Sequence, residues 1–158
     1  MRRLLKVFLI VLCLSLIGGV ALAHPQSSSS TTYVSCSSGC CRIRGYSSVT
    51  VGAWEAVHGH YSVTARAETQ ILYNTVCDSV SCWATFTLKY GSTVAMTLTS
   101  GGALGQTLAV ATWTGNYTDR AVSWTVSGDH RATIFNHGKL GYNAYMTCWT
   151  STGSVPAP

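Results

Sequence analysis

Apolar and polar residues alternate one by one through most of this chain, and this period of two constrains the possible fold more than any other feature. Residues 60–73 divide into an apolar set and a polar set. The apolar set is Tyr61, Val63, Ala65, Ala67, Ile71 and Tyr73, and the polar set is His60, Ser62, Thr64, Arg66, Glu68 and Gln70. Successive side chains of a β-strand point to opposite faces of a sheet, so this segment is predicted to be a strand with one buried face.

The same alternation recurs along the chain, separated by sequences typical of turns. Residues 84–90 and 94–98 flank Gly91-Ser92, which predicts a β-hairpin. Further strands are expected near residues 48–57, 107–113, 121–126, 131–136 and 141–149, with turns at 100–102, 114–116, 127–129 and 137–138. Seven to nine short strands predict an all-β fold, an antiparallel β-sandwich with a barrel as the alternative.

The first 23 residues differ from the rest. Arg2, Arg3 and Lys6 precede the apolar run Val7–Ile17, and Ala21-Leu22-Ala23 follows as a small-x-small cleavage sequence. This order predicts a secretory signal peptide over residues 1–23, a secreted protein, and no membrane span after cleavage. The alternative is an uncleaved membrane anchor, because residues 7–23 form a segment of 17 residues and a spanning helix needs about 17–25.

The mature chain is predicted to contain one β domain, residues 33–150. Residues 24–32 are rich in Ser and Thr and are expected to form a flexible spacer. Residues 151–158 contain Gly and Pro and are expected to form a disordered tail.

Six cysteines remain after the leader, an even number that predicts disulfides in an exported protein: Cys36, Cys40, Cys41, Cys77, Cys82 and Cys148. Cys77 and Cys82 flank a short polar segment that would bring its ends together, so they are predicted to pair. Cys148 is predicted to pair with one of the three cysteines at 36, 40 and 41.

The charge balance excludes one class of partner. Charged residues make up only 9% of the chain, and removal of the leader leaves seven basic and five acidic residues, a net charge of +2. Nucleic-acid binding requires clustered Lys and Arg, so it is not expected. An uncharged extracellular polymer or cell-surface ligand, or copies of the chain itself, fits this composition better.

Aromatic residues are the strongest candidates for ligand contact. The tryptophans favoured for this role are Trp54, Trp83, Trp113 and Trp149. The alternation places Trp83 on the polar face with Thr85, Thr87 and Lys89, and Trp149 opposite the face of Met146. Outward indoles can stack on sugar rings or fill apolar pockets, whereas the alternative role for each is to cap the end of the sandwich.

Catalytic and metal-binding patterns are weak. The five acidic residues and the histidines form no recognisable catalytic motif, so no catalytic residue and no cofactor is predicted. His58, His60 and His130 are weak candidates for metal ligands; Gly59 favours a turn rather than a strand at the first two. Asn116-Tyr117-Thr118 is a glycosylation sequon on a predicted turn, relevant only in a eukaryotic source.

The sequence Gly52-Ala53-Trp54-Glu55 followed by His58-Gly59-His60-Tyr61 resembles the opening of lactococcin-type bacteriocins. The resemblance is confined to these residues, and it implies a small secreted β-sandwich that acts on the cell envelope. The favoured prediction is a non-catalytic secreted protein that binds an uncharged ligand such as carbohydrate. The alternatives are a self-assembling surface or fibre subunit, which would donate Thr32-Tyr33-Val34 to a neighbour's sheet edge, and a bacteriocin-like antibacterial protein.

Overall fold

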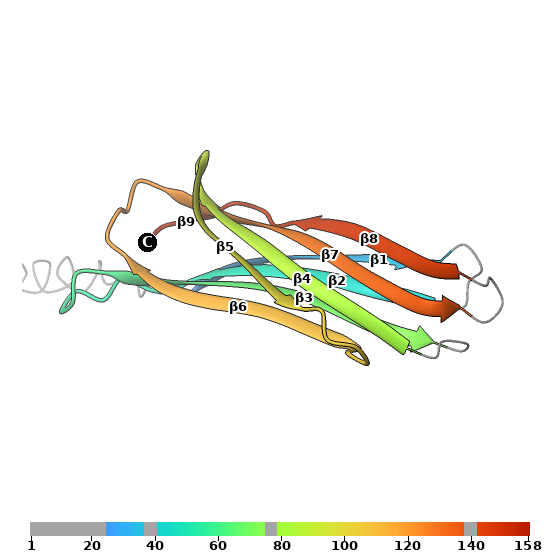
Figure 1. Ribbon diagram of the computed structural model, residues 1–158. Coiled ribbons are helices and arrows are strands. Elements are labelled where there is room, and N and C mark those ends of the chain that lie inside the picture. The colour runs from blue at the N-terminus through green and yellow to red at the C-terminus, as the bar shows by residue number, and fades with distance from the viewer. Residues whose placement is uncertain (1–24, 37–40, 75–78, 138–141) are drawn as a thin grey trace, which may run out of the picture.

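The computed structural model describes residues 25–36, 41–74, 79–137 and 142–158, and the predicted signal peptide lies outside these ranges. Two antiparallel sheets face each other and form an elongated sandwich (Figure 1). The described residues contain nine strands in two separate sheets, so the predicted sandwich is confirmed rather than a sheet closed on itself. Over the same ranges, no helix has the length and apolarity needed to cross a membrane.

The first sheet has the strand order β1-β2-β3-β6 and the second the order β5-β4-β7-β8, with β9 paired to the start of β7. The strands of the first sheet are β1 (Gln26–Ser35), β2 (Cys41–Val51), β3 (Tyr61–Asn74) and β6 (Leu108–Tyr117). Those of the second are β4 (Ser79–Tyr90), β5 (Thr93–Gly101), β7 (Ser123–His137), β8 (Tyr142–Ser151) and β9 (Val155–Pro156).

If β1 is left aside, the strand order matches that of immunoglobulin-like sandwiches. The sheet β2-β3-β6 corresponds to their strands A-B-E, and the facing sheet β5-β4-β7-β8 corresponds to their strands C′-C-F-G. The extra strand β1 pairs with β2 over ten residues, from Gln26 opposite Val51 to Ser35 opposite Arg42. This topology places connecting loops at the two ends of the sandwich and leaves the outer faces of both sheets open. It does not by itself indicate a function, because such sandwiches serve many.

The core lies between the sheets, where the alternation predicts it. In β3, Tyr61, Val63, Ala65 and Ala67 are fully buried, and in β4, Ala84, Phe86 and Leu88 are fully buried. The predicted hairpin is formed by β4 and β5. Burial of the apolar faces of β3 and β4 therefore drives the two sheets together.

Two strands differ from the prediction because their inward faces carry small or polar residues. The structure has β2 at 41–51 rather than 48–57, and one continuous β7 in place of two strands with a turn at 127–129. The imidazole of His130 is fully buried in the core, and it occupies the space left by Gly45 and Gly128. A Cβ at Gly128 would collide with the side chains of Ser47, Thr150 and His130, so this glycine serves close packing and not a turn.

A similar close approach explains the other misplaced turn. The predicted turn at 114–116 lies inside β6, where the indole of Trp113 occupies the space over Gly115. By contrast, the turn predicted at Gly59 is confirmed. Gly59 has φ +66°, and Glu55 and His60 close the turn with a β-bridge.

In the structure, strands occupy parts of both the predicted spacer and the predicted tail. Residues 26–32 belong to β1, where Ser28, Ser30 and Thr32 face inward and are half-buried. Beyond β8, the backbone N–H of Thr152 donates to Val126 and Val155 is buried, so the tail continues along β7. Both segments join the sheets through main-chain hydrogen bonds, which do not require an apolar pattern in the sequence.

Among the described cysteines, Cys36, Cys41, Cys82 and Cys148, no two sulfurs are at disulfide-bonding distance. The predicted link from Cys148 to Cys36 or Cys41 is therefore not formed. Instead, the Cys41 thiol contacts the Met146 sulfur at 3.9 Å. The other predicted links involve Cys40 and Cys77, which lie outside the described residues.

Candidate functional site

Two of the four candidate tryptophans lie on one open surface, the outer face of the second sheet. Trp149 of β8 is 71% exposed, and Tyr145 on the same strand is 73% exposed. Trp83 of β4 is half-buried on the same face. The facing predicted for Trp83 and Trp149 is therefore correct. Tyr145 is a further exposed aromatic residue on this face, and it was not among the predicted candidates although it has the same parity as Trp149.

A groove of about 510 Å³ crosses this face beside Trp83. Its other lining residues include Thr99 of β5, Arg131 and Thr133 of β7, and Tyr145 and Thr147 of β8. Trp83 is fixed because its indole packs on the backbone of Gly102, where φ is +98° and no side chain intervenes. The aromatic residues that line the groove thus lie on strands, which hold side chains more rigidly than loops do.

The strand register places the two indoles diagonally across the face. Trp83 is opposite Arg131 and Asp129 is opposite Trp149, so one residue of β7 lies beside each tryptophan. Two strand spacings and one two-residue step separate Trp83 from Trp149, which amounts to about 12 Å between Cα atoms. An extended ligand that crosses the strands could contact both rings.

The polar groups between the indoles are balanced in charge. Arg131 donates from Nε and Nη2 to both carboxylate oxygens of Asp129, at 2.5–3.1 Å, and this pairing raises the pKa of Arg131. Threonines surround the pair, and Thr85 and Thr99 share a hydrogen bond of 2.8 Å. We call this surface, with Trp83, Asp129, Arg131, Tyr145 and Trp149 at its centre, the aromatic face.

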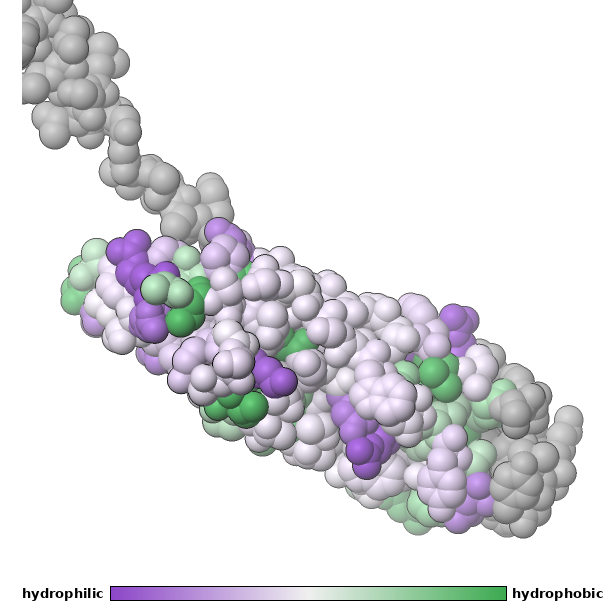
Figure 2. All heavy atoms as spheres, turned by 90° about the horizontal axis from the view of Figure 1, so that it is seen from above, coloured by the Kyte–Doolittle hydropathy of each residue, from purple (hydrophilic) through white to green (hydrophobic). Residues whose placement is uncertain are grey.

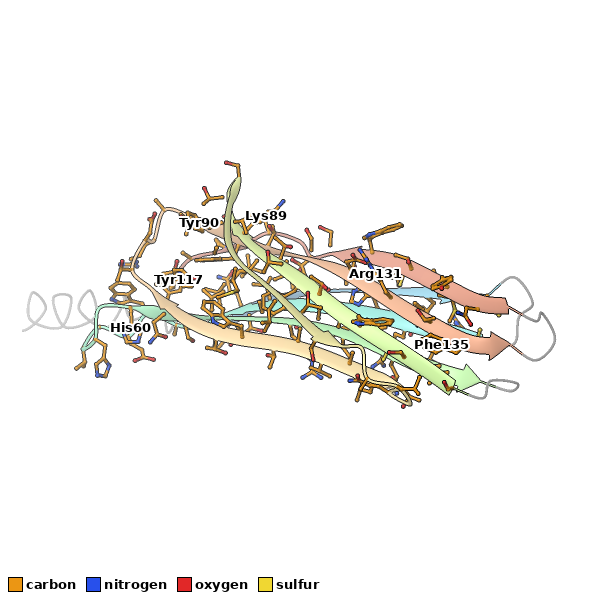
Figure 3. The ribbon with its side chains drawn as sticks, in the orientation of Figure 1. His60, Lys89, Tyr90, Tyr117, Arg131 and Phe135 are labelled. Carbon is orange, nitrogen blue, oxygen red and sulfur yellow. The ribbon has the colours of Figure 1, made fainter. Side chains whose placement is uncertain are left out.

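Figure 2 shows the molecule from above, with surface mostly of intermediate hydropathy and scattered strongly polar or apolar groups. Arg131 and Phe135 lie along β7 in Figure 3, away from the end that carries His60, Tyr90 and Tyr117. Flat rings, hydroxyl groups and a neutralised ion pair suit a ligand that is uncharged and has both apolar and hydroxyl surfaces.

The other two candidate tryptophans are not on the aromatic face. Trp54 packs near Tyr61, with ring centres 6.3 Å apart, and the Arg120 guanidinium lies over its indole at 5.0 Å. Trp113 packs against Tyr117 at 6.2 Å and against the core. Both belong to an aromatic cluster at one end of the sandwich, so the structure does not bring the four candidates together.

The structure brings together two of the three candidate metal-binding histidines, His58 and His60, but not His130. His58 and His60 lie in the exposed turn with their rings 5.5 Å apart, and Glu55 Oε2 is 3.2 Å from His58 Nδ1 and 3.7 Å from His60 Nε2. His130 is in the core. Within the described ranges, no group of three or more His, Cys, Asp or Glu side chains is arranged to hold a metal ion.

Both ring nitrogens of His130 form hydrogen bonds while the imidazole stays neutral. Thr69 uses its only hydroxyl hydrogen to bond the Trp83 carbonyl at 2.7 Å, so it accepts from Nδ1 of His130 at 3.0 Å. Nε2 therefore accepts from the Thr150 hydroxyl at 2.8 Å, and Thr150 in turn accepts from Ser47 at 2.6 Å. Burial lowers the pKa of His130 to about 4, although the nearby Asp129 charge and the Glu68 carbonyl oppose this shift.

This arrangement does not form a nucleophile with access to substrate. Ser47 Oγ is 3.4 Å from His130 Nε2, but both residues are fully buried. Asp129 lies on the opposite side of β7 and pairs with Arg131. The cluster of His130, Ser47, Thr69 and Thr150, which we call the buried polar cluster, therefore holds the two sheets together.

The first sheet carries a different kind of surface. Glu68 is nearly buried between Arg44 and Arg66, with Arg66 donating at 2.6 Å, and these hydrogen bonds outweigh the effect of burial so that the pKa of Glu68 is lowered. The alternation indicates that Glu68 balances Arg66, and the structure adds Arg44. This group accounts for three charged residues of the outer face of the first sheet, and Arg42 on the same face lies over the Tyr33 ring at 4.4 Å.

Compared with models of known protein families, the chain matches none, and no curated protein is similar enough to serve as a relative. The class of protein is thus defined by its architecture and its surfaces. It is a two-sheet antiparallel β-sandwich with an aromatic face on one sheet.

Proposed function

We propose that this protein is a non-catalytic binding protein that acts outside the cell and holds an uncharged carbohydrate polymer on its aromatic face. The observation that carries the proposal is the exposure of Trp149 and Tyr145 on the same sheet face as Trp83 and its groove. Exposed aromatic side chains supply a large contact area and lose little conformational entropy on binding. The predicted signal peptide supports an extracellular location.

The local charge supports a neutral ligand. Arg131 and Asp129 neutralise each other at the centre of the face, and the groove beside Arg131 is lined in part by Thr99, Thr133 and Thr147. A charged polymer would gain little attraction there, whereas hydroxyl groups could exchange hydrogen bonds with the ion pair and the threonines.

The test is retention of the mature protein on insoluble cellulose, chitin and peptidoglycan. Trp149→Ala should weaken binding to the retaining polymer at least about tenfold, because central aromatic contacts contribute most of the affinity of such surfaces. Tyr33→Ala is the matched control, since Tyr33 is an aromatic residue 48% exposed on the other sheet. Failure of all three polymers to retain the wild type, or equal retention of Trp149→Ala, would refute the proposal.

The two alternative functions predicted from the sequence stay predictions. For self-assembly, Thr32–Val34 already pair with β2 of the same chain, so donation to a neighbour requires the β1–β2 hairpin to open. For antibacterial action, the segment Gly52–Tyr61 forms the exposed turn and its flanks. Size-exclusion chromatography at high concentration and growth inhibition of indicator bacteria test these alternatives separately.

A further inference from the structure

A second cavity lies at the end of the sandwich, away from the aromatic face. It has a volume of about 250 Å³ and is lined by Tyr90 from the end of β4, Trp124 from β7, and Asn116, Tyr117, Thr118 and Asp119 from the end of β6 and the connection that follows. Figure 3 shows Tyr90 and Tyr117 at this end. We call this cavity the end pocket.

The aromatic walls of the end pocket hold one another in position. Trp124 is fully buried, and its ring centre is 4.3 Å from that of Tyr117 and 5.4 Å from that of Tyr90. Both tyrosines are half-buried, so part of each ring faces outward. Desolvation raises the pKa of Tyr117, so its hydroxyl stays protonated at neutral pH.

The polar rim is fixed to the core by a chain of hydrogen bonds. The Tyr61 hydroxyl accepts from Trp124 Nε1 at 3.1 Å and donates to the backbone carbonyl of Asp119 at 2.6 Å. Asp119 Oδ1 accepts the N–H of Ala121 at 2.9 Å. A carboxylate has about four acceptor positions, so Asp119 retains capacity for a ligand while its backbone is held still.

Size and charge narrow the ligand class. The cavity is smaller than the roughly 300–1,000 Å³ of sites for drug-sized ligands, which suits a single ring. Arg120, the next residue in the chain, lies over Trp54 and donates to the Pro158 carbonyl at 2.7 Å, whereas the Asp119 carboxylate lines the pocket, where it can accept hydrogen bonds from ligand hydroxyl groups. An aromatic wall beside a carboxylate, an amide and a hydroxyl suits a ring with one apolar face and hydroxyl groups at its edge.

We propose that the end pocket binds one neutral sugar ring, either a free monosaccharide or the terminal residue of a glycan. This site is independent of the aromatic face, which would hold the length of a chain. A protein with both sites would bind a polymer along its length and at its end.

Saturation-transfer NMR and calorimetric titration with glucose, galactose and N-acetylglucosamine test the proposal, and short oligomers of the same sugars distinguish a free sugar from a chain terminus. Asp119→Ala and Tyr90→Ala should each weaken binding at least about tenfold. Asp119 is exposed and its backbone carbonyl remains in the variant, so Asp119→Ala should keep the fold, which a thermal melt would check.

Tyr33→Ala is the matched control, because Tyr33 lies on the first sheet outside both sites and the variant should bind small sugars as the wild type does. Trp149→Ala, which alters only the aromatic face, tests whether the two sites are separate. Loss of polymer retention in this variant with small-sugar binding intact would separate the two sites. The end-pocket proposal is overturned if none of the sugars or oligomers binds, or if Asp119→Ala and Tyr90→Ala bind them with wild-type affinity.

Discussion

Acidification should destabilise this protein through His130 before the carboxylates are protonated. Burial lowers the pKa of His130 to about 4 from an ordinary value of 6.5. Between these values the unfolded chain binds a proton that the folded chain does not. Stability contributed by the neutral imidazole is therefore complete above pH 6.5 and is lost as the pH falls from 6.5 towards 4.

The size of the effect follows from the shift in pKa. A difference of about 2.5 pKa units at roughly 1.36 kcal/mol per unit gives a loss of about 3 kcal/mol. For a domain of this size, such a loss lowers the melting temperature by on the order of 10 °C. Glu68, whose pKa is lowered by Arg44 and Arg66, contributes a further loss, but only below its ordinary value of 4.5.

The assay is urea denaturation at a series of pH values from 7.5 to 4.5, for the wild type and for His130→Gln. The glutamine can donate and accept hydrogen bonds but does not titrate, so this variant should be less stable at pH 7 and should lack most of the pH dependence. His58→Gln, at an exposed position, should keep the wild-type slope. Parallel loss of stability in the wild type and His130→Gln would refute the reasoning. If His130→Gln does not fold, an NMR-determined pKa near 6.5 for His130 in the wild type would refute it equally.

Two further predictions test the packing of the core. Gly128→Ala should reduce the free energy of unfolding by about 2–4 kcal/mol, because the added methyl group would displace Ser47 and Thr150 from the buried polar cluster. Urea denaturation measures this loss, and a loss below about 0.5 kcal/mol would contradict the close packing described at Gly128. In the reduced protein, the thiols of Cys82 and Cys148 are buried and their pKa values are raised to about 11, so they should resist iodoacetamide in the folded state and react after unfolding. Mass spectrometry of the labelled peptides would show whether either thiol reacts early.

The sequence predicts the fold well where the inward side chains are apolar. In β3 and β4 the alternation identifies the strands and the buried face, and it also places Trp83 and Trp149 on the outside. The reason is physical, since burial of an apolar face is the main driving force and has the period of the strand.

The prediction of strands from the sequence fails where the inward side chains are polar or where the backbones of two strands approach closely. The buried polar cluster needs Gly45, Ser47 and Gly128 on inward positions, and each of these residues is more typical of a turn. A single sequence does not show that a serine or glycine of one strand fits a histidine from another. The same limit applies to the end pocket, whose walls come from strands separated by other elements and whose polar groups follow no local pattern.

The extra strand β1 has a consequence for sequence divergence. Its ten residues pair with β2 through backbone atoms, and its serine-rich outer face needs no particular side chain. Most substitutions there should leave the strand in place, apart from proline at a position whose N–H donates to β2. Homologous chains could therefore keep this edge strand while sharing few residues on its outer face, and alignments anchored on those residues would miss the relationship.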